Sequence, residues 1–159
     1  MEKVLPPETR AGSGFEPPRV RQFTIFLENH VGKLQSLLRT LEQEENPIRA
    51  LSVEESADAS LVRLICSDSD LAREASRKNQ FSFGETEMIA VEFPKRTAQP
   101  LITICSALLA AEINIHSAYP FLVRPRGPAL ALYVDDPVLA AQLLIKKGFT
   151  LIAESDFKK

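Results

Sequence analysis

Hydrophobic residues along the first half of the chain follow two spacings, one typical of strands and one of helices. Residues 22–27 are rich in β-branched and aromatic side chains and are predicted to form a strand. Leucines spaced i, i+3, i+4 and i+7 follow, and they predict an amphipathic helix over about residues 32–45. Asn46-Pro47 ends this helix, because a residue before proline disfavours helical geometry. The same reasoning predicts strands at residues 48–54, 60–66 and 82–93 and a helix at 71–79, which gives the order βαββαβ.

The second half of the chain repeats this order. Helices are predicted at residues 99–111 and 138–147, and strands at 113–123, 129–134 and 149–153. Asp136-Pro137 is a helix start signal, and Gly148 stands where a helix C′ residue is expected. The strand that ends at Phe93 either serves both halves or is divided between them.

A single offset relates the two halves. Leu34 and Leu101 are 67 residues apart, and so are Leu71 and Val138. Such a repeat indicates an α+β fold of two ferredoxin-like βαββαβ units in tandem, with antiparallel sheets and helices on one face. We expect an irregular N-terminal arm rich in proline and glycine at residues 1–20, a first unit at 21–84 and a second at 85–159.

Composition narrows the function. The chain has 159 residues, is 45% hydrophobic and 25% charged, and carries a formal net charge of -2, which argues against nucleic acid or a membrane surface as the main partner. It has no run of apolar residues long enough for a transmembrane helix and no secretory signal. Cys66 and Cys105 both lie in apolar runs, so we expect two buried free thiols and a cytoplasmic location.

The segment 28–34 joins the first strand to the first helix. Asn29 can bond backbone groups around the turn, and Gly32 allows close approach because it has no Cβ. The first N–H groups of the helix lack partners within it, so they can receive a carboxylate. This pattern resembles the ligand loop of ACT domains, regulatory modules that bind amino acids, whose motif is Asp/Asn-x-Pro-Gly-x-Leu. Asn29, Gly32 and Leu34 match it, whereas Val31 replaces the proline.

The internal repeat strengthens this resemblance, which covers about residues 21–156. The resemblance implies that an amino acid or a related metabolite binds between two units, in contact with the loop of one and a strand of the other. The expected binding residues are, in the loop, Asn29, His30, Val31, Gly32, Lys33 and Leu34, and on the facing strand, Asn114, His116 and Ser117. Strict alternation places Asn114 and His116 on one face of that strand and Ser117 and Tyr119 on the other, and the sequence does not say which face lines the site. In the second unit Arg96, Ala98 and Gln99 replace Asn29, Val31 and Gly32, so one functional loop is expected rather than two.

Simpler interpretations stay open for these residues. Asn29 and Gly32 also suit an ordinary turn, His30 an exposed surface position and His116 a packing position in a strand. No catalytic motif, metal-ligand spacing or phosphate-binding glycine loop is present, so we expect no enzyme activity, no metal and no cofactor.

The resemblance implies a non-catalytic regulatory module that works as a homodimer or with a partner enzyme. Three alternatives remain. The chain could be a regulatory subunit of an amino-acid biosynthetic enzyme such as acetolactate synthase, although those subunits resemble it over one ACT domain only. It could be a structural protein with vestigial ligand loops, which a pocket beside Gly32 would argue against. An acylphosphatase-like hydrolase is the least favoured, because the turn lacks the arginine that it would need.

Overall fold

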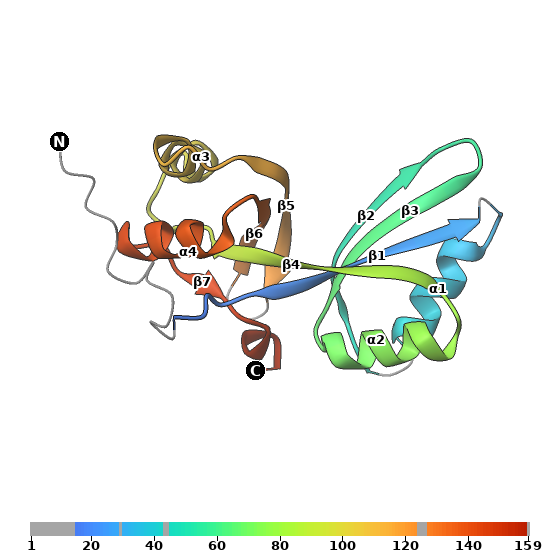
Figure 1. Ribbon diagram of the computed structural model, residues 1–159. Helices are drawn as coiled ribbons and strands as arrows, with labels where there is room; N and C mark the ends of the chain where they lie inside the picture. The colour runs from blue at the N-terminus through green and yellow to red at the C-terminus, as the bar shows by residue number, and fades with distance from the viewer. Residues whose placement is uncertain (1–14, 29, 43–44, 124–126, 159) are drawn as a thin grey trace.

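A seven-stranded antiparallel sheet runs through the protein, with the strand order β2-β3-β1-β4-β6-β5 and β7 paired to β4 (Figure 1). The computed structural model describes residues 15–28, 30–42, 45–123 and 127–158. The elements of the first half are β1 (Val20–Glu28), α1 (Lys33–Glu42), β2 (Ile48–Glu55), β3 (Ala59–Cys66), α2 (Ser69–Lys78) and β4 (Ser82–Glu92). Those of the second half are α3 (Pro100–Ala110), β5 (Ile115–Val123), β6 (Gly127–Val134), α4 (Pro137–Lys146), β7 (Leu151–Ile152) and the 3₁₀-helix η2 (Glu154–Lys158). The predicted tandem ferredoxin-like fold is therefore confirmed.

Strand β4 belongs to both units. Its residues from Ser82 to Met88 pair with β1, and those from Ile89 to Glu92 pair with β6. It is thus the last strand of the first unit and the first strand of the second, which is the first of the two arrangements that the sequence allowed. The boundary predicted at residues 84–85 lies inside this strand.

The helices cover one face of the sheet. Alternate residues along each strand point toward the helices. Each unit therefore has its own hydrophobic core between its strands and its two helices. In the first unit Phe23, Ile25 and Leu64 pack with Leu37 and Leu41 of α1. The second unit packs the larger set Ile89, Val91, Leu130 and Leu132 against Ile104, Leu108, Ala141 and Leu144 of α3 and α4.

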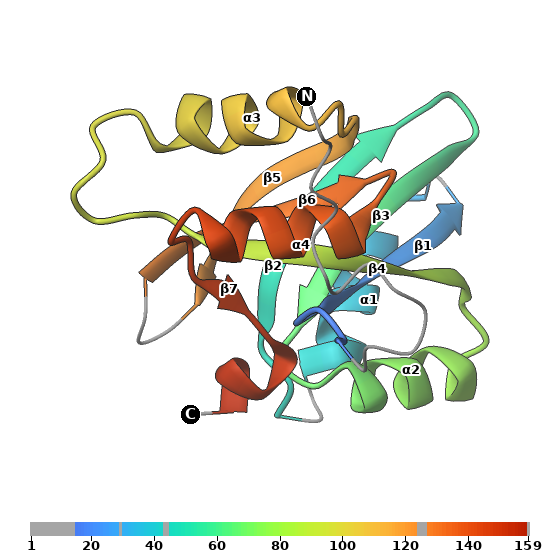
Figure 2. The same cartoon turned by 60° about the vertical axis from the view of Figure 1, so that its left-hand side comes forward.

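A third core lies on the opposite face of the sheet, where the two units meet. The sheet curls so that its helix-free faces turn toward each other, and the edge strands β2 and β5 lie against one another (Figure 2). Ala50 and Ile65 of the first unit pack there with Phe121, Ala131 and other buried residues of the second. Ala90 of β4 and Ala129 and Ala131 of β6 are small side chains on this face, and they allow the two layers to approach closely.

Two β-bulges bring β2 and β5 into this third core. The pairing register shifts between Ile48 and Ala50 in β2 and at the equivalent place, between Ile115 and Ser117, in β5. Ile115 packs on the helix side, whereas Tyr119 packs on the opposite side. Strict alternation would have put these two residues on one face, so alternation fails across the bulge. From Ser117 to Val123 the register does not shift, and Ser117 and Tyr119 share a face as predicted.

Helix α3 differs from its prediction in which side is buried. Cys105 was expected to be buried, but it is an exposed free thiol, and Leu101 in the first turn is 54% exposed. Ile104, Ala107 and Leu108 are buried instead. Because α3 carries no charged residue, its pattern could not indicate which side faces solvent. Cys66, by contrast, is fully buried as predicted.

The C-terminal turn holds the second unit against the first. Glu154 of η2 accepts hydrogen bonds from Nε and Nη2 of Arg21, each at 2.8 Å, and from the Ser69 hydroxyl at 2.9 Å. Arg21 also donates to Asp70 at 3.0 Å. Phe157 of the same 3₁₀-helix packs in the third core, and the guanidinium of Arg49 lies over its ring.

The pKa of Glu154 reflects these contacts. Burial alone would raise it, but the hydrogen bonds from Arg21 and Ser69 and the charge of Arg21 outweigh burial, so the pKa is lowered. None of the described helices has the length and apolarity required to cross a membrane.

We expect Glu154→Gln to lower the free energy of unfolding by about 2 kcal/mol at pH 7, because the neutral amide loses charge-assisted bonds to Arg21. Since the folded pKa is lowered, the contribution of Glu154 is present above its unfolded pKa of about 4.3 and is lost as the pH falls through the folded value. Urea denaturation at pH 7 and at pH 3 measures both effects. Glu74→Gln, at an exposed position of α2, is the control. The stabilising role of Glu154 would be contradicted if both variants lost the same free energy of unfolding, or if the loss in Glu154→Gln were as large at pH 3 as at pH 7.

Candidate functional site

The turn between β1 and α1 has the geometry that an anion-binding helix start requires. The His30 N–H donates to the Glu28 carbonyl at 2.8 Å, and the Lys33 N–H donates to the His30 carbonyl at 3.2 Å. Gly32 has φ +86°, a left-handed conformation that strains residues with a Cβ. A Cβ there would meet nothing within 4 Å, so the glycine is required by the backbone and not by crowding. Asn29 lies outside the described residues.

The first turn of α1 carries positive charge without a compensating carboxylate. It contains Lys33 and no acidic residue. The Ser36 N–H bonds the Gly32 carbonyl at 3.0 Å. Within the part of the chain that the structure describes, the N–H groups of Leu34 and Gln35 have no acceptor. These two amides and the helix dipole therefore favour an anion in front of α1.

The remaining loop residues have different surroundings. Val31 is fully exposed. The His30 Nε2 lies 3.3 Å from a Glu28 carboxylate oxygen, and both side chains are largely exposed. Leu34 is half-buried and packs against the core of the first unit. The loop thus offers backbone amides, Lys33 and His30 to solvent, while Leu34 anchors the helix.

The residues predicted on the facing strand lie in the second unit. Asn114 precedes β5, and its N–H donates to the Asp135 carboxylate at 3.1 Å. His116 is exposed and its ring lies 5.2 Å from that of Tyr133, while Ser117 is half-buried. Both views place the start of β5 away from the β1–α1 turn (Figures 1 and 2). Among the described residues no hydrogen bond, ion pair or ring contact joins the two groups, so one chain does not bring them together.

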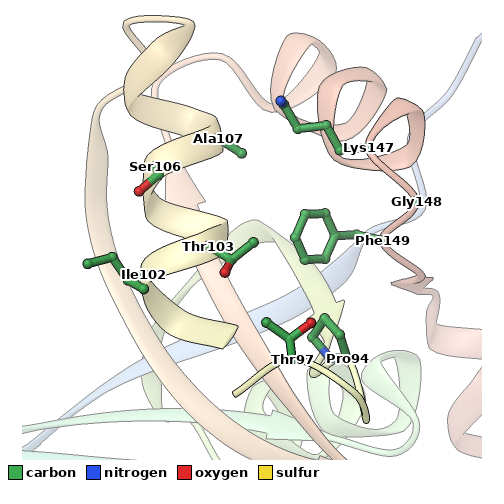
Figure 3. Close-up of a pocket in the computed structure, with 9 residues that line it drawn as sticks. All are labelled: Pro94, Thr97, Ile102, Thr103, Ser106, Ala107, Lys147, Gly148 and Phe149. Carbon is green, nitrogen blue, oxygen red and sulfur yellow. The ribbon is translucent and has the colours of Figure 1, made fainter. Parts of the chain in front are cut away.

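Sequence reasoning missed a cavity in the second unit. It has a volume of about 700 Å³ and lies between the β4–α3 loop, helix α3 and the turn that follows α4 (Figure 3). Its lining includes Thr97, Lys147 and Phe149, none of which was among the predicted site residues. The residues come from segments about 50 positions apart in the chain, and no motif joins them. The cavity is built on the second-unit loop, where Gln99 has φ -131° in place of the left-handed Gly32.

Two further groups with shifted pKa values, Cys66 and Tyr119, are largely buried. Burial raises the pKa of the Cys66 thiol to about 12, so it stays protonated and is a poor nucleophile. Burial also raises the pKa of Tyr119, whose hydroxyl donates to the Gln22 amide oxygen at 2.6 Å across the third core. Among the described residues, no group of three or more His, Cys, Asp or Glu side chains is placed to hold a metal ion.

Comparison with known proteins identifies the fold family. The family model described as an ACT domain pair matches residues 19–159. Protein BT0572 from Bacteroides thetaiotaomicron superimposes with a TM-score of 0.80 at 27% sequence identity, over 90% of this chain and 98% of that one.

Two regulatory subunits of aspartate kinase share the fold at lower similarity. The ligand-free subunit from Thermus thermophilus gives a TM-score of 0.56 at 9% identity, over 82% of this chain and 93% of that one. The subunit from Thermus flavus gives 0.52 at 10% identity, over 82% and 90%. A comparison with curated proteins gave no match. With the family model spanning both units and their shared strand, the chain belongs to the family of ACT domain pairs.

Proposed function

We propose that this ACT domain pair is a non-catalytic regulatory module that binds a small amino acid or a related metabolite at the β1–α1 turn. The observation that carries the proposal is the start of α1. There, among the described residues, the N–H groups of Leu34 and Gln35 have no acceptor, and the exposed Lys33 follows the left-handed Gly32. A ligand carboxylate in front of these amides would replace the missing cap of the helix. His30 and its partner Glu28 lie at the same turn and would meet the polar end of the ligand.

The second half of the site would come from another chain. Asn114, His116 and Ser117 are exposed or half-buried but do not reach the β1–α1 turn of their own chain. We therefore propose a homodimer in which the turn of one chain faces the start of β5 of the other. Binding would then fix the angle between two chains, and a cytoplasmic partner enzyme would respond to that angle.

A thermal-shift screen against the amino acids tests the proposal. A ligand bound only by the folded state raises stability by about 2.7 kcal/mol at a hundredfold excess over its Kd. We expect Gly32→Ala to lose most of the ligand-induced shift, because a Cβ at φ +86° strains the turn that presents the amides.

Gly127→Ala is the matched control. Gly127 also has a left-handed φ, +109°, with open space around its Cβ position, but it lies in the β5–β6 hairpin. Both variants should lose similar stability without ligand, about 1–2 kcal/mol, and only Gly32→Ala should lose the response. If no amino acid shifts the wild type, or if both variants respond equally, the proposed site is wrong.

A second candidate function is assembly without a ligand, and helix α3 favours it. Leu101, Ile102 and Leu109 are 54%, 60% and 76% exposed. Helices α1 and α2 instead carry charged residues among their exposed positions. An uncharged helix with an apolar outer side suits a protein interface. In this interpretation α3 would pack on α3 of a second copy of the chain.

If α3 forms such an interface, Leu109→Glu should weaken the dimer by at least about tenfold, because each interface would bury two carboxylates in an apolar contact. Sedimentation velocity across a concentration series measures the dissociation constant. Lys78→Gln, which lowers the net charge by the same one unit at an exposed position of α2, is the control and should leave association unchanged. Equal association in wild type and Leu109→Glu would remove α3 from the interface.

A further inference from the structure

Positive charge gathers at one end of the second unit. Lys95 and Arg96 lie in the loop between β4 and α3. Lys146 and Lys147 stand at the C-terminal end of α4. The loop and the helix end adjoin each other, because Lys95 and Gly148 line the same small hollow. All four cationic residues are exposed, and within the part of the chain that the structure describes none of them has an ion-pair partner. We call these four residues the basic end.

The surroundings of the basic end do not neutralise its charge. Gln99 begins α3 without a side-chain cap, and the first turn of this helix has no acidic residue, so the positive end of the helix dipole adds to the field. Among the described residues that line the two hollows here, Glu92 is the only acidic one, and it is half-buried. Pro94 and Phe149 add apolar surface to the open groove (Figure 3). Such a surface fits a protein segment that is acidic and carries an apolar side chain.

The hairpin between β2 and β3 in the first unit is a segment of this kind. It carries three exposed acidic residues, Glu54, Glu55 and Asp58. Glu54 accepts an ion pair from Arg63 at 3.0 Å, whereas Glu55 and Asp58 have no ion-pair partner among the described residues. Val53, in the same hairpin, is 45% exposed. This acidic hairpin therefore has free carboxylates beside an apolar side chain, which complement the basic end in charge.

The basic end and the acidic hairpin lie at opposite ends of the molecule. In both views the β4–α3 loop and the end of α4 are on the left, and the β2–β3 hairpin extends on the right (Figures 1 and 2). Strand β4 joins the two units through unbroken ladders, which hold these ends apart. A contact between the two surfaces therefore requires a second copy of the chain. Their opposite charges would also orient the two copies, because like ends repel each other.

We propose that the acidic hairpin of one chain binds the basic end of a second copy of this chain. The carboxylates of Glu55 and Asp58 pair with the cations of the β4–α3 loop and of the end of α4. Two chains that lie side by side in opposite directions make this contact twice. The contact involves no ligand at the β1–α1 turn and does not depend on the function proposed for that turn.

Sedimentation velocity of the full chain at about 50 mM and about 500 mM salt tests the inference. The wild type should associate at the lower salt and more weakly at the higher, because salt screens exposed charges. The double variant Lys95→Glu, Lys147→Glu and the double variant Glu55→Lys, Asp58→Lys should each raise the dissociation constant by about tenfold or more. All four substitutions in one chain exchange the two charges, so this variant should associate within about threefold of the wild type.

The double variant Arg77→Glu, Lys78→Glu is the control, since it makes the same change in charge at exposed positions at the end of α2. It should associate as the wild type does, and a melting curve of each variant checks that it folds. A control as weak as the Lys95→Glu, Lys147→Glu variant would reduce the effect to net charge and overturn the contact. A chain with all four substitutions that stays as weak as the double variants would overturn the pairing of the two surfaces. A wild type that is monomeric at the lower salt, or reversed variants that associate like the wild type, would overturn the proposal.

Discussion

The two hydrogen-bond ladders of strand β4 are the constraint on which the rest of the structure depends. The strand pairs with β1 through one part of its length and with β6 and β7 through the other. Its pleat continues without a bulge, so one row of its side chains faces the helices of both units while Met88 and Ala90 face the third core. No linker separates the units. Rotation of one unit against the other within a chain would require breaking a ladder or opening a core, and each is costly.

The third core fills the space between the helix-free faces of the two units. The helix-free faces, which would be open in a flat sheet, are buried against each other by Ala50, Phe121 and Ala131. Edge strands β2 and β5 meet there, and the turn η2 closes one end through Glu154 and Phe157. The β1–α1 turn is left at the outer end of the first unit. Burial of the inner faces thus directs this turn toward other molecules rather than toward the second unit.

The repeated sequence pattern predicted the fold well but could not predict how its surfaces differ. Element order followed from periodicity and caps, because Asp68 and Asp136 cap equivalent helices. The first helices of the two units begin 67 residues apart, at Lys33 and Pro100, and the two caps are 68 residues apart. The placement of Ile115 and Tyr119 on opposite faces was missed, since the bulge after Ile115 inverts the alternation and leaves no mark in composition. The exposure of Cys105 was missed for another reason. Helix α3 carries no charged residue and only Thr103 and Ser106 as polar ones, so the sequence holds a weak amphipathic signal for its orientation.

The two candidate sites also differ in whether their residues are neighbours in the sequence or meet only in the fold. The turn at Gly32 could be read from seven consecutive residues because its chemistry is that of a strand end and a helix start. The cavity at Phe149 could not, because it exists only when the β4–α3 loop packs beside the turn after α4. The repeat nevertheless relates the two, since both are built on the loop that begins the first helix of a unit. In the first unit that loop contains the left-handed Gly32, and in the second Gln99 and Pro100 begin the helix without a side-chain cap. Because the units cannot rotate freely, a ligand at either loop would act by changing how the outer surface of this rigid pair meets another chain. Such a ligand shifts the equilibrium between two modes of association only if it binds one mode more tightly than the other.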